Sequence, residues 1–406
     1  MVVREASGRI SCVNLGGIAG VWLLSHVWGR GLFVCPHRAS RLQIGRWHGL
    51  PSHPKNTLLE ENIMKKSKKI VSAVLALSMA VCLGACSKAA APADSTSPEA
   101  PTVAATDVKI GILQYATHAS LYDCYTGILE GLKNEGYIDG ETCTIEYVDG
   151  QGEAETNSLA ASNFVSNGYD MIIAIATPSA MAAYAVAKDA GIPVVFSACS
   201  DPVGAGLVET LEAPNTGATG TSDSLNFDGQ LKMIRAFLPE AKKIGVLYTT
   251  SEANSVSQLA KLTEMAPDYG FEIVSVGVTD ASEVATGAAA LIAQGVDCIN
   301  NLTDNNVVNN LSVVTNAADA AGIPIFGSEQ QQVAQYGCVA SETLDYVALG
   351  VTTGEMAGQI LKGADVKTLP VSVITDSKPV YSLVNMAKFK LELPADYASA
   401  TNVDAQ

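Results

Sequence analysis

The sequence after Met64 has few of the side chains on which enzymes depend. His118 is its one histidine and it has no tryptophan, because Trp22, Trp28, Trp47 and the other four histidines precede Met64. With one histidine, no metal cluster of histidine ligands can form, and a Ser-His-Asp arrangement would depend on His118. The phosphate-binding patterns Gly-x-x-x-x-Gly-Lys-Ser/Thr and strand-linked Gly-x-Gly-x-x-Gly are also absent. We therefore predict that the protein is not an enzyme and uses no metal and no cofactor.

Positive charge is also scarce. The 406 residues include 25 Lys and Arg against 41 Asp and Glu, a net charge of −16. Residues 1–85 hold 11 of the basic residues and 3 of the acidic ones, which leaves 14 against 38 for residues 86–406. An acidic body of this kind argues against nucleic acid as a partner and against a repressor-like regulator.

The number and spacing of the cysteines do not indicate disulfide bonds. The body of the chain contains Cys124, Cys143, Cys199, Cys298 and Cys338, an odd number, and no Cys-x-x-Cys. This pattern indicates neither a complete disulfide framework nor a zinc site. Cys143, Cys199 and Cys298 lie in apolar, strand-like contexts, where a free thiol acts as a small core residue.

The segment from Met64 reads as a secretion signal. Four lysines between residues 65 and 69 precede an uncharged apolar run, Ile70–Ala85, which is shorter than the roughly 20 residues of a spanning helix. The run ends in Leu-Gly-Ala-Cys, which resembles the lipobox of bacterial lipoproteins and implies acylation of Cys86. Residues 87–106, rich in Ala, Pro, Ser and Thr, predict a flexible tether.

Residues 1–63 do not fit in front of such a signal, because a signal peptide works at the N-terminus. They have no sustained period of 2 or 3.6 residues. Leu59–Asn62 could be encoded by a ribosome-binding sequence just before the Met64 codon. We therefore expect translation to begin at Met64, with residues 1–63 untranslated or non-native.

Residues 107–406 alternate short Val- and Ile-rich runs with longer Ala- and Leu-patterned ones, which predicts an α/β protein with parallel sheets. Helices of about ten to eighteen residues fit between the runs. The predicted strands are Val108–Gln114, Cys143–Val148, Met171–Ala176, Val194–Ser197, Ile244–Thr249, Glu272–Val276, Val296–Leu302 and Ile323–Gly327.

An internal repeat divides this body into two similar lobes. Lys-Ile-Gly-Ile-Leu at 109–113 recurs as Lys-Ile-Gly-Val-Leu at 243–247, and Ala-Gly-Ile-Pro at 190–193 recurs at 321–324. In each Ala-Gly-Ile-Pro, glycine is placed to end a helix and proline to begin a strand. Ligands of open parallel sheets bind outside the carboxyl ends of the strands, so two such edges that face one another predict a cleft.

Two turns at these edges carry the main ligand-binding hypothesis. Thr177 is suited to cap a helix with Pro178 in its first turn, which would leave amide groups free for an anion, although a well-capped helix alone explains the pattern. Asp304 is placed to cap another helix or to accept hydrogen bonds from a ligand ammonium group. Asp201 and Glu329 are alternative ammonium partners. Donors on one lobe opposite acids on the other suit a zwitterion.

Seven segments, in order, resemble the ABC-transporter substrate-binding lipoprotein family that includes tryptophan and aromatic-amino-acid binding proteins. The resemblance covers about residues 107–390. The segments are KIGILQYATHASLYDCYTGILEGLKNEGY, AIATPSAMAA, VVFSACSDPVGAGLV, NTGATGTSD, IGVLYTTSEANS, TDNNVV and LGVTTGEMAGQILKG.

The resemblance implies a periplasmic-binding-protein fold of the type-I-like kind, with two Rossmann-like lobes joined by hinge crossovers near Ser222 and Gly337. A helix at 344–363 would return to the first lobe. The implied division is a signal peptide at 64–85, a lipidated Cys86 with its tether at 86–106, an N-terminal lobe of 107–222 plus 337–365, and a C-terminal lobe of 223–336 plus 366–406.

The implied function is capture of a small ligand between the lobes and delivery to an ABC permease and its ATPase, by a monomer anchored outside the cytoplasm through Cys86. An amino acid is the first expectation. A sugar or nucleoside, or a ligand-sensing role beside a membrane receptor, is the alternative. The family's ligand positions correspond to Thr117, His118, Thr177, Ser179, Asp201, Asn254, Ser255, Asp304, Asn305 and Ser328.

Overall fold

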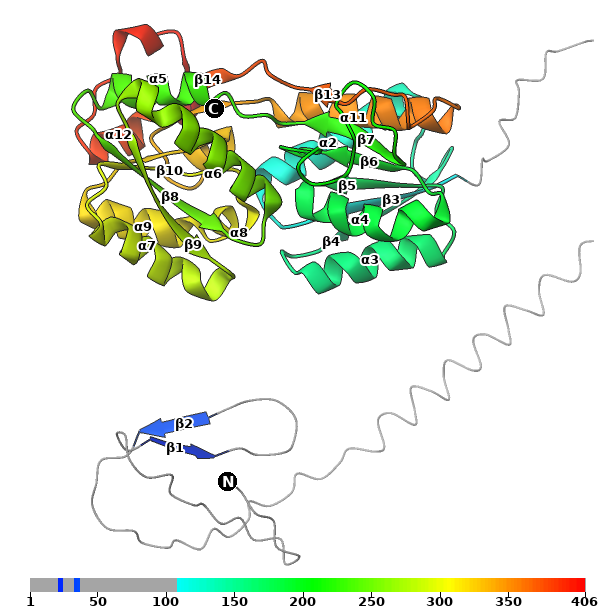
Figure 1. Ribbon diagram of the computed structural model, residues 1–406, viewed down its shortest axis with the longest axis horizontal. Helices are drawn as coiled ribbons and strands as arrows, with labels where there is room; N and C mark the ends of the chain where they lie inside the picture. The colour runs from blue at the N-terminus through cyan, green and yellow to red at the C-terminus, as the bar shows by residue number, and fades with distance from the viewer. Residues whose placement is uncertain (1–20, 25–32, 37–107, 406) are drawn as a thin grey trace, which may run out of the picture. The chain divides into compact units, whose positions relative to one another are not determined.

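A computed structural model describes residues 21–24, 33–36 and 108–405. The expected signal peptide, Cys86, the tether and most of residues 1–63 lie outside these ranges. Within the first 96 residues, strands β1 (Val21–Leu24) and β2 (Phe33–Pro36) pair antiparallel. Residues 108–405 belong to a separate compact unit that contains both predicted lobes (Figure 1).

The first lobe has one parallel sheet of six strands. Its strand order is β13-β7-β6-β5-β3-β4, and every neighbouring pair runs parallel. The strands are β3 (Lys109–Gln114), β4 (Thr144–Asp149), β5 (Met171–Ile175), β6 (Val194–Ser197), β7 (Ala218–Ser222) and β13 (Ser372–Val373).

Helices cover both faces of this sheet because its strands are apolar on both sides. Ile110 and Ile112 pack with α2 (Ala119–Asn134) and α11 (Tyr346–Leu361), while Leu113 packs with α3 (Ala154–Ser166) and α4 (Thr177–Ala190). Near-continuous apolar strands of this kind are typical of buried parallel sheets. In Figure 1 the α2–α11 layer and the α3–α4 layer lie on opposite sides of the sheet.

Helices α2 and α11 approach so closely that only glycine fits between them. A β-carbon at Gly350 would lie 2.2 Å from the carbonyl oxygen of Cys124, and one at Gly127 would lie 2.1 Å from the carbonyl oxygen of Val347. We call this contact, which also includes Gly131 and Gly354, the glycine seam. It fixes the returning helix α11 to the first lobe.

The second lobe repeats the layered plan. Its parallel sheet has the order β11-β10-β8-β9, with α5 and α6 on one face and α7 and α9 on the other. The elements are α5 (Phe227–Phe237), β8 (Lys243–Thr249), α6 (Ala253–Met265), β9 (Glu272–Val278), α7 (Val284–Ala293), β10 (Cys298–Asn300), α8 (Asn305–Asn309), α9 (Leu311–Ala321), β11 (Ile325–Phe326) and α10 (Gln330–Ala334).

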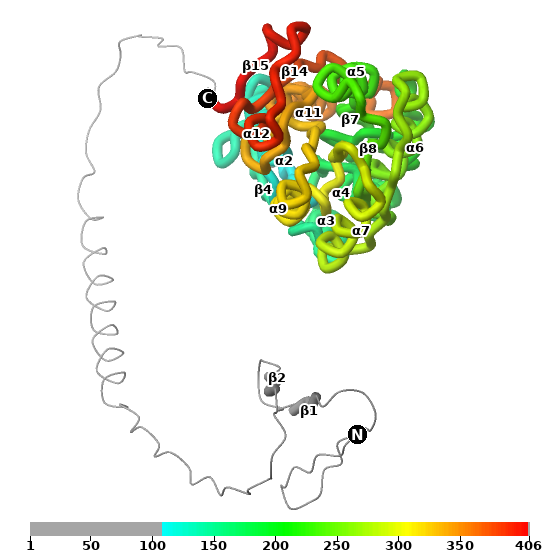
Figure 2. The backbone as a smooth tube through the Cα atoms, turned by 90° about the vertical axis from the view of Figure 1, so that its left-hand side faces the viewer, coloured from blue at the N-terminus to red at the C-terminus, as the bar shows by residue number. Residues whose placement is uncertain are grey.

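A three-stranded sheet extends the second lobe. Strand β12 (Ala340–Thr343) pairs antiparallel with β14 (Lys378–Tyr381), which pairs parallel with β15 (Thr401–Asn402), and a bridge from Gly327 to Ser341 joins β12 to the end of β11. The end-on view in Figure 2 places β14 and β15 on the side of the molecule opposite α3 and α7.

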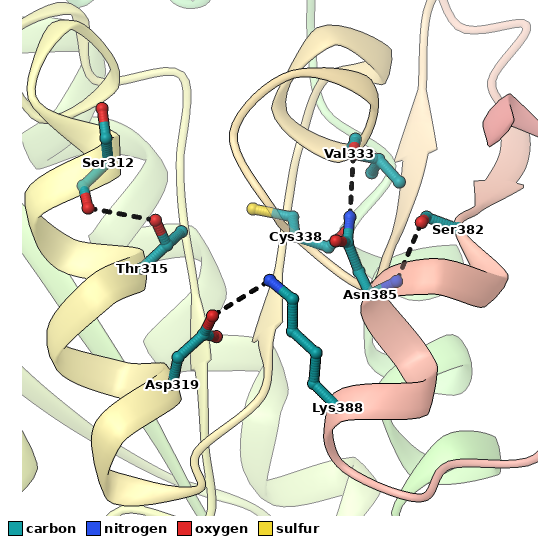
Figure 3. Close-up of polar contacts among 8 residues, drawn as sticks. All are labelled: Ser312, Thr315, Asp319, Val333, Cys338, Ser382, Asn385 and Lys388. Atoms are coloured by element: carbon teal, nitrogen blue, oxygen red, sulfur yellow. Dashed lines mark hydrogen bonds and ion pairs between the residues drawn. The ribbon is translucent and has the colours of Figure 1, made fainter.

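Helix α12 (Leu383–Lys388) fastens the C-terminal segment to this lobe. The Asn385 side chain donates to the carbonyl oxygens of Val333 and Cys338 at 3.1 and 3.0 Å, and the Lys388 ammonium lies 3.0 Å from the Asp319 carboxylate (Figure 3). The C-terminal segment is therefore an integral part of the second lobe.

Three crossovers join the lobes, and two differ in position from the expected boundaries. The first follows β7, near Ser222 as expected. The second lies between β12 and α11 rather than near Gly337, because β12 bonds to the second lobe. The third lies between β13 and β14 rather than after residue 365, because β13 pairs with β7 of the first lobe. Short, weakly patterned strands explain both differences.

The repeated helix-to-strand punctuation is confirmed. Helices α4 and α9 end in Gly191 and Gly322, whose φ angles of 71° and 72° are left-handed, and β6 and β11 begin just after the following prolines. Cys143, Cys199 and Cys298 are buried as free thiols, as expected, and so are Cys124 and Cys338.

Candidate functional site

A pocket lies where the carboxyl ends of the two sheets face one another. Its cavity volume is about 10 Å³, and its lining residues come from both lobes and from the crossovers. We call it the interlobe pocket. Its lining residues are Leu121, Ala176, Thr177, Ala198, Ser200, Asp223, Asn254, Thr303, Asn305, Glu329 and Tyr346.

The first-lobe wall is formed where β5 and β6 end. Helix α4 begins at Thr177, and Ala176 precedes it with a φ of 78°, so Thr177 is not the N-cap that the sequence suggested. Its hydroxyl lies 3.5 Å from the Cys199 sulfur instead. Ala198 also has a positive φ, of 53°. Such strained backbone in non-glycine residues persists where surrounding structure enforces it, commonly at binding sites.

The second-lobe wall presents two buried asparagines. The Asn254 amide donates to the carbonyl oxygen of Thr303 at 3.0 Å, and its own oxygen Oδ1 is buried with no partner in the structure. Asn305 donates from Nδ2 to Glu252 at 2.6 Å. Because the amide nitrogen of Asn254 is held by its own lobe, a hydrogen-bond acceptor remains for the pocket.

Asp304 does not line this pocket. It caps α8 by accepting from the Val307 amide at 2.8 Å, and it accepts from both the amide and the hydroxyl of Thr249. Burial raises its pKa, and burial together with the nearby Asp304 charge raises the pKa of Glu252. The oxygens of Asp304 are bonded within the second lobe, and an ammonium-binding role for Asp304 stays a prediction.

His118 joins the lobes beside the pocket. Its Nε2 lies 3.3 Å from the Asn305 side-chain oxygen, and its Nδ1 is buried with no partner in the structure. Burial lowers the pKa of His118 to about 4, so the ring is neutral near pH 7. The predicted turns after β3 and β10 thus meet, as neighbours of the pocket.

Three predicted serines do not line the pocket and bond within their own lobes. Ser179 donates to Asn157 of α3 at 2.7 Å, and Ser328 donates to the carbonyl oxygen of Asn301 at 2.7 Å. Ser255 is buried and bonds to the Asp304 carboxylate. Their hydroxyls hold the two walls in place.

Thr117 and Asp201 lie outside the interlobe pocket. Thr117 donates to Asp149 of its own lobe at 2.6 Å, near the surface. Asp201 accepts from Ser257 of α6 at 2.7 Å and so bonds across the lobes. Thr177, Asn254 and Asn305 are the predicted residues that the pocket brings together.

The match to known proteins agrees with this architecture. The sequence profile described as ABC transporter substrate binding protein matches residues 109–399. The chain belongs to this family of substrate-binding proteins. Members of the family are extracytoplasmic. Among the residues that the structure describes, no helix is both long and apolar enough to cross a membrane.

Relatives of this substrate-binding protein have named ligands. A tyrosine-binding protein of Clostridioides difficile is 37% identical over 316 residues, which is 78% of this chain and 90% of that protein. A Streptococcus pneumonia domain in complex with L-Trp is 32% identical, with a TM-score of 0.70 over 73% of this chain and 99% of that one.

A third relative indicates that the lobes here are closed. The ligand-free, open structure of a substrate binding protein with adhesive properties from Clostridium difficile is 37% identical over 73% of this chain and 98% of that one, yet its TM-score is 0.56. This open structure is more similar in sequence than the L-Trp complex but superposes less well on the present chain. Its two lobes are therefore arranged differently relative to one another. Hydrogen bonds between the lobes also indicate a closed arrangement: Gln258 donates to Ser200 at 2.9 Å, and Gln331 donates to Asp123 at 2.8 Å.

The substrate-binding protein also has pocket residues that the sequence did not single out. Asp223 lies in the first crossover, and Tyr346 begins α11 directly after the second. Glu329, named as an alternative, lines the pocket, whereas Ser328 does not. Asp223 directly follows β7, a strand that was not predicted. The sequence signal that could have identified Asp223 was an acidic residue next to Ser222, where the first hinge crossover was expected.

Proposed function

We propose that the protein captures a small zwitterionic amino acid, preferably aromatic, and delivers it to the permease of an ABC importer. One observation carries this proposal: the interlobe pocket sets the N-terminal end of α4 at Thr177 against the carboxyl groups of Asp223 and Glu329. A helix N-terminus favours a carboxylate, and a carboxyl group accepts hydrogen bonds from an ammonium group. Relatives named for tyrosine and L-Trp support the ligand class.

The presence of apolar residues in the lining supports a ligand with an apolar side chain. Leu121, Ala176 and Ala198 contribute aliphatic surface, and Tyr346 contributes an aromatic ring. The role we propose is capture without chemistry: the ligand bridges the lobes and stabilises the closed arrangement, which a permease then receives.

A thermal-shift screen of the purified protein tests the ligand class. The panel should contain all common amino acids, several sugars and several nucleosides. We expect L-tyrosine or L-tryptophan, at a concentration about 100-fold above its Kd, to raise the Tm by about 5 °C. Their N-acetyl and methyl-ester derivatives should fail, because each lacks one of the two charges. Stabilisation by a sugar or nucleoside alone would refute the proposal.

We also propose that Cys86 carries the lipid anchor and that the mature protein acts as a monomer beside its permease. The lipobox-like sequence before Cys86 supports this. Mass spectrometry of the protein from its native membrane should show an acylated N-terminal Cys86 and no peptides from residues 1–63. A Cys86→Ser variant that still fractionates with the membrane would contradict the anchor.

A further inference from the structure

Asp223 and Glu329 are acids buried in the interlobe pocket. Each has only 2% of its surface exposed. Asp223 accepts from the Ser200 hydroxyl at 2.9 Å and from the Tyr346 hydroxyl at 3.1 Å, and Glu329 accepts from the Gln332 amide at 3.0 Å. All of these donors are neutral, so hydrogen bonds alone hold the two carboxyl groups.

Within residues 108–405, no positively charged side chain lines the pocket beside the two acids. The interlobe pocket is lined by no Lys, Arg or His. Burial raises the pKa of Asp223 to about 7, and it raises the pKa of Glu329 to about 7 as well. His118, beyond Asn305, is neutral at that pH. The titratable groups around the pair are acidic or uncharged: Asp123 and Cys124 of α2, Cys199 after β6, Tyr336 and Cys338 after α10, and Tyr346 of α11.

Burying two carboxylates with no balancing positive charge is strongly unfavourable. The bonds that hold the lobes together are weak by comparison, because they join neutral groups or a carboxylate and a neutral donor. Examples are the contacts of Gln258 with Ser200, Ser257 with Asp201, and His118 with Asn305. A single hydrogen bond of this kind contributes less than the burial of a carboxylate costs, so the charge state of Asp223 and Glu329 decides whether closure is favourable.

We propose that Asp223 and Glu329 form the ammonium subsite of the pocket and that the lobes close only when positive charge neutralises this pair. The charge is the ammonium group of the ligand or, in acid, a proton. The proposal rests on the proposed amino-acid function. At neutral pH it keeps the unloaded protein open, so that the closed form presented to a permease is the loaded one.

The test measures lobe closure directly. Spin labels at Leu159→Cys on α3 and Val313→Cys on α9, both at exposed positions, report the distance between the lobes. We expect the open distance at pH 8 without ligand, and the closed distance when L-tyrosine or L-tryptophan is added. Lowering the pH to 5 without ligand should also populate the closed distance.

Isosteric variants separate charge from shape. The double variant Asp223→Asn, Glu329→Gln should populate the closed distance at pH 8 without ligand, lose the pH dependence and bind L-tyrosine at least tenfold more weakly. Asp376→Asn, whose side chain is 88% exposed, should behave like the parent. An open double variant with the affinity of the parent overturns the proposal.

A second measurement needs no substitution. In the parent protein, the affinity for L-tyrosine should weaken about tenfold as the pH falls from 7.5 to 5, because protons compete for the pair. A pH-independent affinity overturns the proposal while leaving amino-acid capture intact. If no amino acid binds, the proposed function fails, and acid-induced closure of the parent but not of the double variant still supports charge-gated closure.

Discussion

Asp304 shows that a buried acid at the cleft edge can serve its own lobe rather than a ligand. It caps α8 through the Val307 amide and bonds to Thr249 at the end of β8. Without it, two buried amide groups and a hydroxyl would lose their acceptor, and each unsatisfied buried group costs about 1–3 kcal/mol. Its contribution is therefore to the free energy of folding.

We expect Asp304→Ala to lower the Tm by about 5 °C or more, because it removes the cap and the bonds to Thr249. Calorimetric unfolding of the ligand-free protein measures this. Asp345→Ala is the matched control, since Asp345 caps α11 by accepting from the Ala348 amide at an exposed site, and it should cost about 1 kcal/mol. An Asp304→Ala variant with unchanged Tm and no ligand binding would support the ammonium role.

At the scale of elements, the glycine seam between α2 and α11 is the contact most sensitive to added volume. The Gly350→Ala side chain would meet the backbone of Cys124, which cannot move aside as a flexible side chain can. We expect a net cost of about 3 kcal/mol, even after the roughly 1 kcal/mol gain in helix propensity. Urea unfolding measures it as a lower midpoint.

Gly217→Ala is the control for the seam. The nearest atom to a β-carbon at Gly217 is 3.9 Å away, on Tyr184, and we expect a change within about 0.5 kcal/mol. If both variants unfold at the urea midpoint of the parent, the helices can separate without cost and the seam does not hold α11.

The elements also explain what the sequence could and could not predict. Strands such as β3, β5 and β8 were predicted because they are apolar runs bounded by turns. Strand β7 reads Ala-Thr-Gly-Thr-Ser, yet all five residues are buried. Its burial depends on α11, which packs on β7 from far along the chain, and Thr353 of α11 bonds to Thr221 at 2.8 Å. The local sequence pattern of β7 therefore does not show that a distant helix buries this strand.

Local sequence pattern also identified only some of the residues of the site. Thr177, Asn254 and Asn305 were found because they follow predicted strands in recognisable turns. Asp223 was missed because it follows β7, and Tyr346 because it begins the helix that returns across the hinge. Ser179 and Ser328, taken from the family resemblance, do not line the pocket, because a motif locates a turn but not the direction of each side chain within it.

For the whole molecule, buried acids make stability depend on pH. Burial and Asp304 raise the pKa of Glu252 above its unfolded value, so its favourable contribution is complete at acidic pH and is lost as the pH rises through the folded value. Glu252 and its partners Asn305 and Asn306 all belong to the second lobe, so these bonds do not depend on closure of the lobes.

We therefore expect the Tm of the ligand-free protein to fall by about 5 °C between pH 5 and pH 9, as measured by differential scanning calorimetry. Glu252→Gln should reduce this fall, because glutamine carries no ionisable group. Glu240→Gln, at an exposed position, should leave it unchanged. A Tm that rises over this range would show that Glu252 is ionised in the folded protein without cost.

The glycine seam also sets the time at which the first lobe can be completed during synthesis. At its edge Asn134 bonds to Glu355, 221 residues further along the chain. At about 5–20 residues per second, the bare face of α2 waits roughly 10 to 40 seconds for α11 to emerge. A chain that stops before Tyr346 has a first lobe without α11 and so with an incomplete α2–α11 layer, which means that the two lobes cannot be produced as separate, contiguous modules.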